Sequence, residues 1–157
     1  MSTLLAVRRA LLAASAVVMA LLLVALVLLD FLRVVLRYLV GEGFAWAPDL
    51  AVIWLIALAW IGAGHLWLAR SHIAIDLFDQ PRWLRIGVSA LVAGGVAVLV
   101  PIVWKTIGAY GFIDLPALPL SAAAKYWPIM GGIVFLGVAA FVDLLIAVLE
   151  ANGSLRE

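Results

Sequence analysis

The sequence predicts an all-α integral membrane protein whose single domain crosses the bilayer four times. Three observations predict this fold class. Hydrophobic residues make up 68% of the chain and charged residues only 12%, and the mean hydropathy of +1.27 is too high for a water-soluble domain of this size. Four apolar runs each approach the ~20 residues that a helix needs to cross hydrocarbon. Five of the seven tryptophans lie near the ends of these runs, where indole rings prefer the headgroup level.

The expected spans are 10–29, 50–69, 86–104 and 127–149, and they form one four-helix membrane domain over residues 1–157. This length leaves no room for a separate soluble catalytic domain. The chain has no cysteine, which excludes disulfides, thiol catalysis and cysteine-based metal sites. A net charge of +1 without a polybasic tract gives no support for nucleic-acid binding. We therefore expect the lipid bilayer to be the main surroundings of the chain.

The first apolar run follows Arg8 and Arg9, as the core of a signal peptide would. However, it is longer than a usual signal core and reaches Asp30 without an evident small-residue cleavage site, so we expect a retained helix. Residues 30–37 contain no Gly or Pro, which predicts that the helix continues beyond the hydrocarbon.

The second helix is expected to begin near Pro48, which suits a first helical turn, with Asp49 at the positive end of the helix dipole. Its small residues at 62–64 predict close approach to another helix. After it, residues 70–81 mix polar and apolar side chains, which indicates a short segment lying at the cytoplasmic interface between helices 2 and 3. At the start of the last helix, Ser121 is an expected cap and Pro128 is expected either to kink the helix or to tighten its entrance.

The basic residues outside the spans predict the orientation. Six of them fall on one side of the membrane and four on the other, a modest bias that favours cytoplasmic termini. The first group is Arg8, Arg9, Arg70, Arg82, Arg85 and Arg156, and the second is Arg33, Arg37, Lys105 and Lys125.

Asp143 is the one acid well inside an expected span, where an unpaired carboxylate costs on the order of 3 kcal/mol on insertion scales. It is a candidate polar or proton-linked group, but pairing with a cytoplasmic-side arginine (Arg9, Arg70 or Arg85) is the more ordinary interpretation. His65 is the other candidate intramembrane polar group, and an interhelical hydrogen bond is its ordinary role.

His65 and His72 are seven residues apart, which raises the question of haem. Axial ligands must converge from opposite faces of the porphyrin, and two histidines on one helix do not provide that without a second chain. Lys105 and Lys125 are expected to extend to the headgroups rather than to bind an anion. No metal-binding, nucleophile-elbow or phosphate-loop motif occurs, so the sequence predicts neither an enzyme nor a cofactor site.

Several ordered segments resemble the small membrane subunit of tripartite ATP-independent periplasmic (TRAP) transporters, the DctQ-like family. Residues 30–37 are similar to the acid and arginine at the end of its first helix, and 70–76 are similar to its Arg…His-Ile-x-Val-Asp signature, the most specific element. Residues 46–49 are similar to its Trp followed by acidic residues, with one departure: the family often has two adjacent acids there, whereas Pro48 precedes a lone Asp49 here. Further likeness is found at Trp54, Gly62, Ala63 and residues 126–129.

The resemblance implies a four-helix subunit of the bacterial or archaeal inner membrane that scaffolds a large membrane subunit (M-like). It also implies a periplasmic substrate-binding protein (P-like) as partner, with sodium ions and an organic acid moved by the large subunit. The candidate partner contacts form an outer and an inner group. The outer group is Asp30, Arg33, Arg37, Trp46 and Asp49, and the inner group is Arg70, His72 and Asp76.

Two other classes of function stay open. The chain would be a small homo-oligomeric channel or exporter if Asp143 and His65 lined a pathway, or a membrane anchor for haem or quinone. The lack of duplicated halves and of paired broken helices does not favour a self-sufficient transporter.

Overall fold

The computed structural model describes residues 2–41, 43–69 and 82–151. Within these ranges the chain forms four long helices and a short 3₁₀-helix, η1, and each long helix is long and apolar enough to cross a membrane. The predicted four-span fold is confirmed. Every long helix contains its expected span and extends beyond it at one end or both. The helices are α1 (Ser2–Leu39), α2 (Ala47–Ala69), α3 (Arg82–Tyr110), η1 (Ala122–Lys125) and α4 (Trp127–Ala151).

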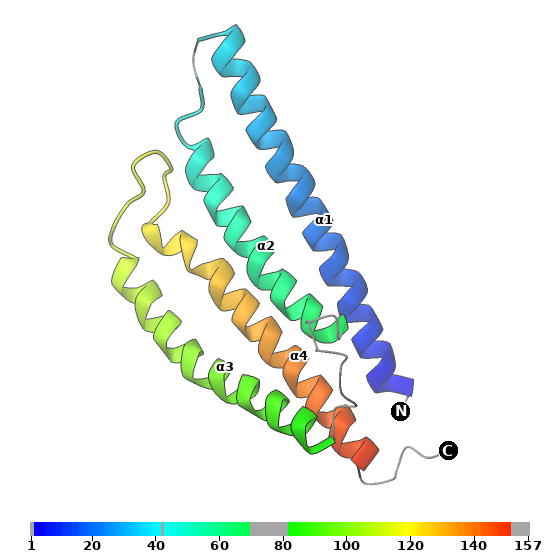
Figure 1. Ribbon diagram of the computed structural model, residues 1–157. Coiled ribbons are helices and arrows are strands. Elements are labelled where there is room, and N and C mark those ends of the chain that lie inside the picture. The colour runs from blue at the N-terminus through cyan, green and yellow to red at the C-terminus, as the bar shows by residue number, and fades with distance from the viewer. Residues whose placement is uncertain (1, 42, 70–81, 152–157) are drawn as a thin grey trace.

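The four long helices lie side by side, with α4 between α2 and α3 and with α1 on the far side of α2 (Figure 1). α4 is accordingly the most buried helix, whereas α1 packs mainly on α2 and exposes most of its length. The first residues of α1 and the last residues of α4 lie at the same end of the bundle (Figure 1).

Glycines bring α4 close to its neighbours. A Cβ atom at Gly132 would collide with Cβ of Trp60 in α2 and lie 3.0 Å from its carbonyl carbon, so the two backbones nearly touch. Gly64 of α2 lies under the ring of Phe135 in the same way. The sequence predicted this role for the small residues of helix 2. Gly64 approaches α4, whereas Gly62 faces Met19 of α1.

We call the end of the bundle that holds the first residues of α1 the inner end and the opposite end the outer end, as names for the two ends of the bundle alone. The connection from α1 to α2 lies at the outer end (Figure 1). Gly41 follows α1 with a φ of 78°, a left-handed conformation that glycine adopts without a steric penalty. α2 then begins at Ala47 with Pro48 as its second residue, which confirms the predicted start. Phe44 and Trp46 stack just before it, with ring centroids 5.1 Å apart.

The outer connection from α3 to α4 is an ordered hairpin-like loop. Backbone hydrogen bonds join Ile113 to Ala122 and Leu115 to Leu120. Ser121 was predicted to cap the helix that enters the membrane, and it lies at the N-cap position of η1, so its position is confirmed but capping by its side chain is not. Its backbone pairs across the loop with Asp114, and its side chain makes no cap hydrogen bond to η1, which precedes α4.

Pro128 is the second residue of α4. Its missing N–H falls in the first turn, where an α-helix has no internal partner for that group, so it tightens the entrance and does not kink the helix. The interfacial segment predicted between α2 and α3 lies outside the described residues.

Candidate functional site

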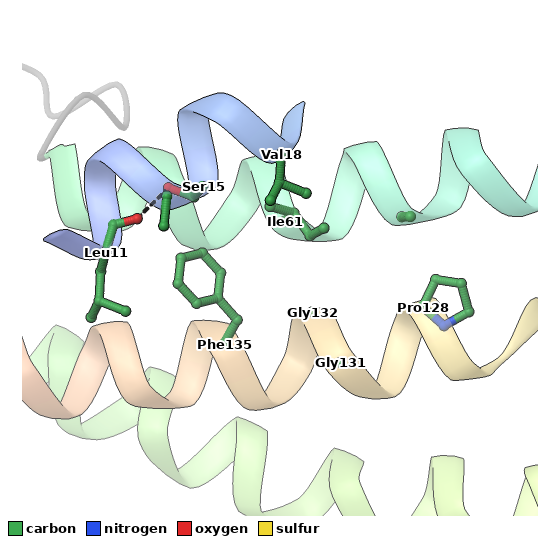
Figure 2. Close-up of a pocket in the computed structure, with 10 residues that line it drawn as sticks. Leu11, Ser15, Val18, Ile61, Pro128, Gly131, Gly132 and Phe135 are labelled. Atoms are coloured by element: carbon green, nitrogen blue, oxygen red, sulfur yellow. Dashed lines mark hydrogen bonds between the residues drawn. The ribbon is translucent and has the colours of Figure 1, made fainter. Parts of the chain in front are cut away.

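His65 forms an interhelical hydrogen bond in the inner half of the bundle. Its Nδ1 atom lies 2.8 Å from Oγ of Ser15, so α2 is joined to α1 at this point. The same Oγ lies 2.7 Å from the carbonyl oxygen of Leu11 (Figure 2). A hydroxyl carries a single hydrogen. We therefore expect Ser15 to donate to Leu11 and His65 to donate from Nδ1 to Ser15.

Asp143 contacts a different pair of helices. Ser89 of α3, which is 1% exposed, donates a hydrogen bond to Oδ2 of Asp143 in α4 at 3.2 Å. Asp143 thus belongs to the α3–α4 contact and His65 to the α1–α2 contact, on opposite sides of the bundle (Figure 1). This arrangement does not favour a single pathway lined by both residues. The predicted arginine partner of Asp143 stays a prediction.

Arg8 closes the inner end of α2. Its guanidinium donates from Nε and Nη2 to the carbonyl oxygen of Leu68, at 2.9 and 2.6 Å. The last carbonyls of a helix lack internal partners and carry the negative end of the dipole, so a cation there is stabilising. The sequence identified Arg8 only as a flanking charge, because nothing in its local pattern points to a residue sixty positions away.

Lys125 was predicted to extend to the headgroups, and the structure corrects this prediction. Its Nζ atom forms an ion pair with Oδ1 of Asp49 at 3.1 Å, and the two side chains are 33% and 23% exposed. Asp49 lies in the first turn of α2 and Lys125 ends η1, so the pair joins two outer segments. Asp49 therefore has a structural role within the chain.

The predicted outer group separates into two parts. Trp46 and Asp49 lie at the start of α2 and have partners there, Phe44 and Lys125. Asp30, Arg33 and Arg37 lie on the outer end of α1, where Asp30 and Arg37 are exposed and Arg33 is half-buried. Among the described residues, none of these three takes part in a side-chain hydrogen bond or ion pair. The outer end of α1 therefore presents charges that the chain itself leaves available.

The predicted inner group, Arg70, His72 and Asp76, lies outside the described residues. Over the ranges that the structure covers, no three His, Cys, Asp or Glu side chains gather as metal ligands would.

An apolar groove of about 380 Å³ runs between α1, α2 and α4 (Figure 2). Gly131 and Gly132 leave space on the α4 side, and Ala14 and Ala57 leave space on the others. Ser15 contributes the hydroxyl group in an otherwise hydrocarbon lining, so the groove suits hydrocarbon and not an ion. It is lined by Leu11, Ala14, Ser15, Val18, Ala57, Ile61, Pro128, Gly131, Gly132 and Phe135.

Comparison with known families matches residues 26–149 to the family described as tripartite ATP-independent periplasmic transporters, DctQ component. The matched region includes the outer part of α1, all of α2 and α3, and nearly all of α4. No individual curated protein matches the chain. Because the matched region is most of the sequence, the chain belongs to the DctQ family, the small membrane subunits of TRAP transporters.

Proposed function

We propose that this chain scaffolds the large (M-like) subunit of a TRAP transporter and helps to dock a periplasmic (P-like) substrate-binding protein during sodium-coupled uptake of an organic acid. The family match over residues 26–149 is the observation that carries the proposal. On this proposal the sodium ion and the substrate bind to the large subunit. The chain lies in the inner membrane with both termini in the cytoplasm.

The placement of the intramembrane polar groups supports a scaffolding role. Ser15 and His65 join α1 to α2, and Ser89 and Asp143 join α3 to α4. Groups that bond to each other across helix contacts stabilise a bundle. A transport pathway would instead need polar groups that converge on one water-filled cavity.

The charges on the outer end of α1 support a docking role. Asp30 and Arg37 are exposed there and take no part in the ion pairs of the described residues. Exposed charges steer encounter with a soluble partner and set its orientation. At the inner end, Arg70, His72 and Asp76 are proposed to hold the large subunit.

Gentle purification of the tagged chain from native membranes, followed by mass spectrometry, tests the complex. We expect one large multi-helix subunit in amounts comparable to the chain, and less of it after substitution of Arg70, His72 and Asp76. Recovery of a homo-oligomer alone would contradict the proposed function.

The docking role predicts that Arg37→Glu lowers uptake in proteoliposomes that contain both membrane subunits. With the binding protein below saturation, we expect about a tenfold loss, equivalent to about 1.4 kcal/mol of docking energy. A high concentration of binding protein should recover much of the rate.

Lys105→Glu is the matched control, because Lys105 is also an exposed outer cation but lies on α3. Its uptake should equal that of the unmodified protein. Asp49 is unsuitable for this test, since reversing the charge of its side chain would also break the ion pair with Lys125. Equal uptake for Arg37→Glu and Lys105→Glu at every binding-protein concentration would count against docking at α1.

A further inference from the structure

α1 is too long for the membrane that it crosses. Its 38 residues give a length of about 57 Å at 1.5 Å per residue, against about 35 Å for the 23 residues of α2. The hydrogen bonds from Arg8 to Leu68 place the inner ends of the two helices at one level. Hydrocarbon is about 30 Å thick, so α1 leaves it near Leu28, and Tyr38 lies about 45 Å from Arg8.

Tilting does not remove this excess. A typical tilt of about 20° reduces the 45 Å only to about 42 Å. α2 lies alongside α1 (Figure 1), so a tilt steep enough to bury all of α1 would draw both ends of α2 into hydrocarbon as well. Asp49 in the first turn of α2 would then be buried in lipid. The last turns of α1 therefore stand in the headgroup layer or in water.

Large apolar side chains nevertheless occupy one face of α1 from the edge of the hydrocarbon outward. Val27, Phe31, Val34 and Tyr38 follow one another at intervals of three and four residues, which places them on one side of the helix. They are 58%, 65%, 52% and 83% exposed. We call these four residues the outer α1 face. Exposed apolar surface outside the hydrocarbon is a usual mark of a protein contact.

The same side of α1 continues into the membrane as a row of small residues. Ala13, Ala16 and Ala20 share the helical face of Val27 and are exposed. α2 packs elsewhere on α1, through Ser15 and Met19. Small residues let another transmembrane helix approach closely. One continuous surface of α1 thus runs from the membrane interior to its outer side, and it lies on a different side of the helix from the contact with α2.

We infer that the outer α1 face, together with the alanines below it, binds a transmembrane helix of the large subunit that also extends beyond the outer leaflet. A soluble protein that docks and departs would return Phe31 and Tyr38 to water in every cycle. A resident membrane subunit covers them permanently, and permanent interfaces are the more apolar ones. Asp30 and Arg37 lie along one edge, as charges do at an interface rim. The inference rests on the proposed function.

Labelling of a single thiol tests the surface, because the chain has no native cysteine. Tyr38→Cys is treated with a membrane-impermeant maleimide in membranes containing the chain alone or the chain with the co-expressed large subunit. We expect the large subunit to slow labelling by about tenfold or more. A tenfold change corresponds to a free-energy difference of about 1.4 kcal/mol between the covered and the accessible state of the thiol. Phe112→Cys, at a site 93% exposed in the other outer connection, reports that the reagent reaches the outer side of both samples.

A second measurement follows recovery of the large subunit on the tagged chain. Phe31→Ala combined with Tyr38→Ala should lower recovery about tenfold, since buried aromatic residues dominate interface energies. Leu21→Ala combined with Leu28→Ala is the matched control. These two leucines are 65% and 59% exposed but point to a different side of α1, and recovery should be unchanged.

Equal labelling of Tyr38→Cys in both membranes, while the large subunit still co-purifies, would overturn this inference and leave the proposed function intact. Protection that appears only with added binding protein would also overturn it, as would a disulfide-linked dimer of the chain alone. If the unmodified chain recovers no large subunit, the proposed function itself fails.

Discussion

Two adjacent glycines in α4 have different surroundings although the sequence gives no reason to distinguish them. Gly132 lies against the backbone of Trp60, where a Cβ atom has no room. Gly131 faces the open groove, and a Cβ atom there would meet nothing within 4 Å. The packing of α4 on α2 therefore depends on one residue of this pair.

Gly132→Ala should destabilise the chain, because the new methyl group must push the α2 and α4 backbones apart. Overpacking of this kind costs about 1–3 kcal/mol. Reversible unfolding in detergent by titration with sodium dodecyl sulfate measures the change. Gly131→Ala is the control and should be neutral or more stable by up to about 1 kcal/mol, since alanine is the better helix former. Equal effects of the two substitutions would show that α2 and α4 are not in close contact at Gly132.

At the scale of the elements, polar interactions between residues distant in sequence occur in several of the helix contacts, whereas the α2–α4 contact rests on the close approach at Gly132 and Gly64. Arg8 with Leu68 and Ser15 with His65 hold α1 on α2, and Asp49 with Lys125 holds the start of α2 on η1. Each of these contacts places a charge or hydrogen bond at a helix end or in an apolar interface, where few other partners exist.

The ion pair between Asp49 and Lys125 predicts a measurable coupling between the two outer connections. Asp49→Asn and Lys125→Met should each lower the free energy of unfolding by about 0.5–1 kcal/mol, the range for partly exposed pairs. The double variant should cost less than the sum of the two, because either change alone removes the pair. A charge swap, Asp49→Lys with Lys125→Asp, should recover part of the loss. Strict additivity in the detergent unfolding assay would show that the pair contributes no coupling energy.

The elements could be predicted from the sequence because their signals are local. Long apolar runs and tryptophans at their ends marked the helices, and Pro48 marked the start of α2. The partners of polar residues could not be predicted, since they depend on which helices become neighbours. Lys125 has the local pattern of a lysine at a membrane boundary, yet its partner Asp49 is 76 residues away. Ser121 has the local pattern of a cap and lies at the N-cap position of η1, but its side chain makes no cap hydrogen bond and its backbone pairs with Asp114.

At the scale of the whole molecule, the four long helices follow one another as neighbours in the order α1, α2, α4, α3 and expose many large apolar side chains. α4 supplies much of the buried core, including Ile133, Ala139 and Ala140. Such a surface fits a chain surrounded by lipid and by other membrane subunits. The number of spans was evident from hydropathy, but the side-by-side order α1, α2, α4, α3 was not (Figure 1).

The even number of crossings and the basic residues together predict one orientation. The first residues of α1 should lie in the cytoplasm, and the hairpin-like loop before η1 should lie outside. In whole cells whose outer membrane is permeable to the reagent, an impermeant maleimide should label Phe112→Cys and leave Ala6→Cys unlabelled until the inner membrane is permeabilised. Both sites are exposed in the chain, so a difference in labelling reports which side of the membrane each occupies and not burial. Labelling of Ala6→Cys in intact cells with protection of Phe112→Cys would reverse the orientation. That orientation would place the outer α1 face in the cytoplasm, together with Arg37 at its edge. A periplasmic protein could then not reach Arg37.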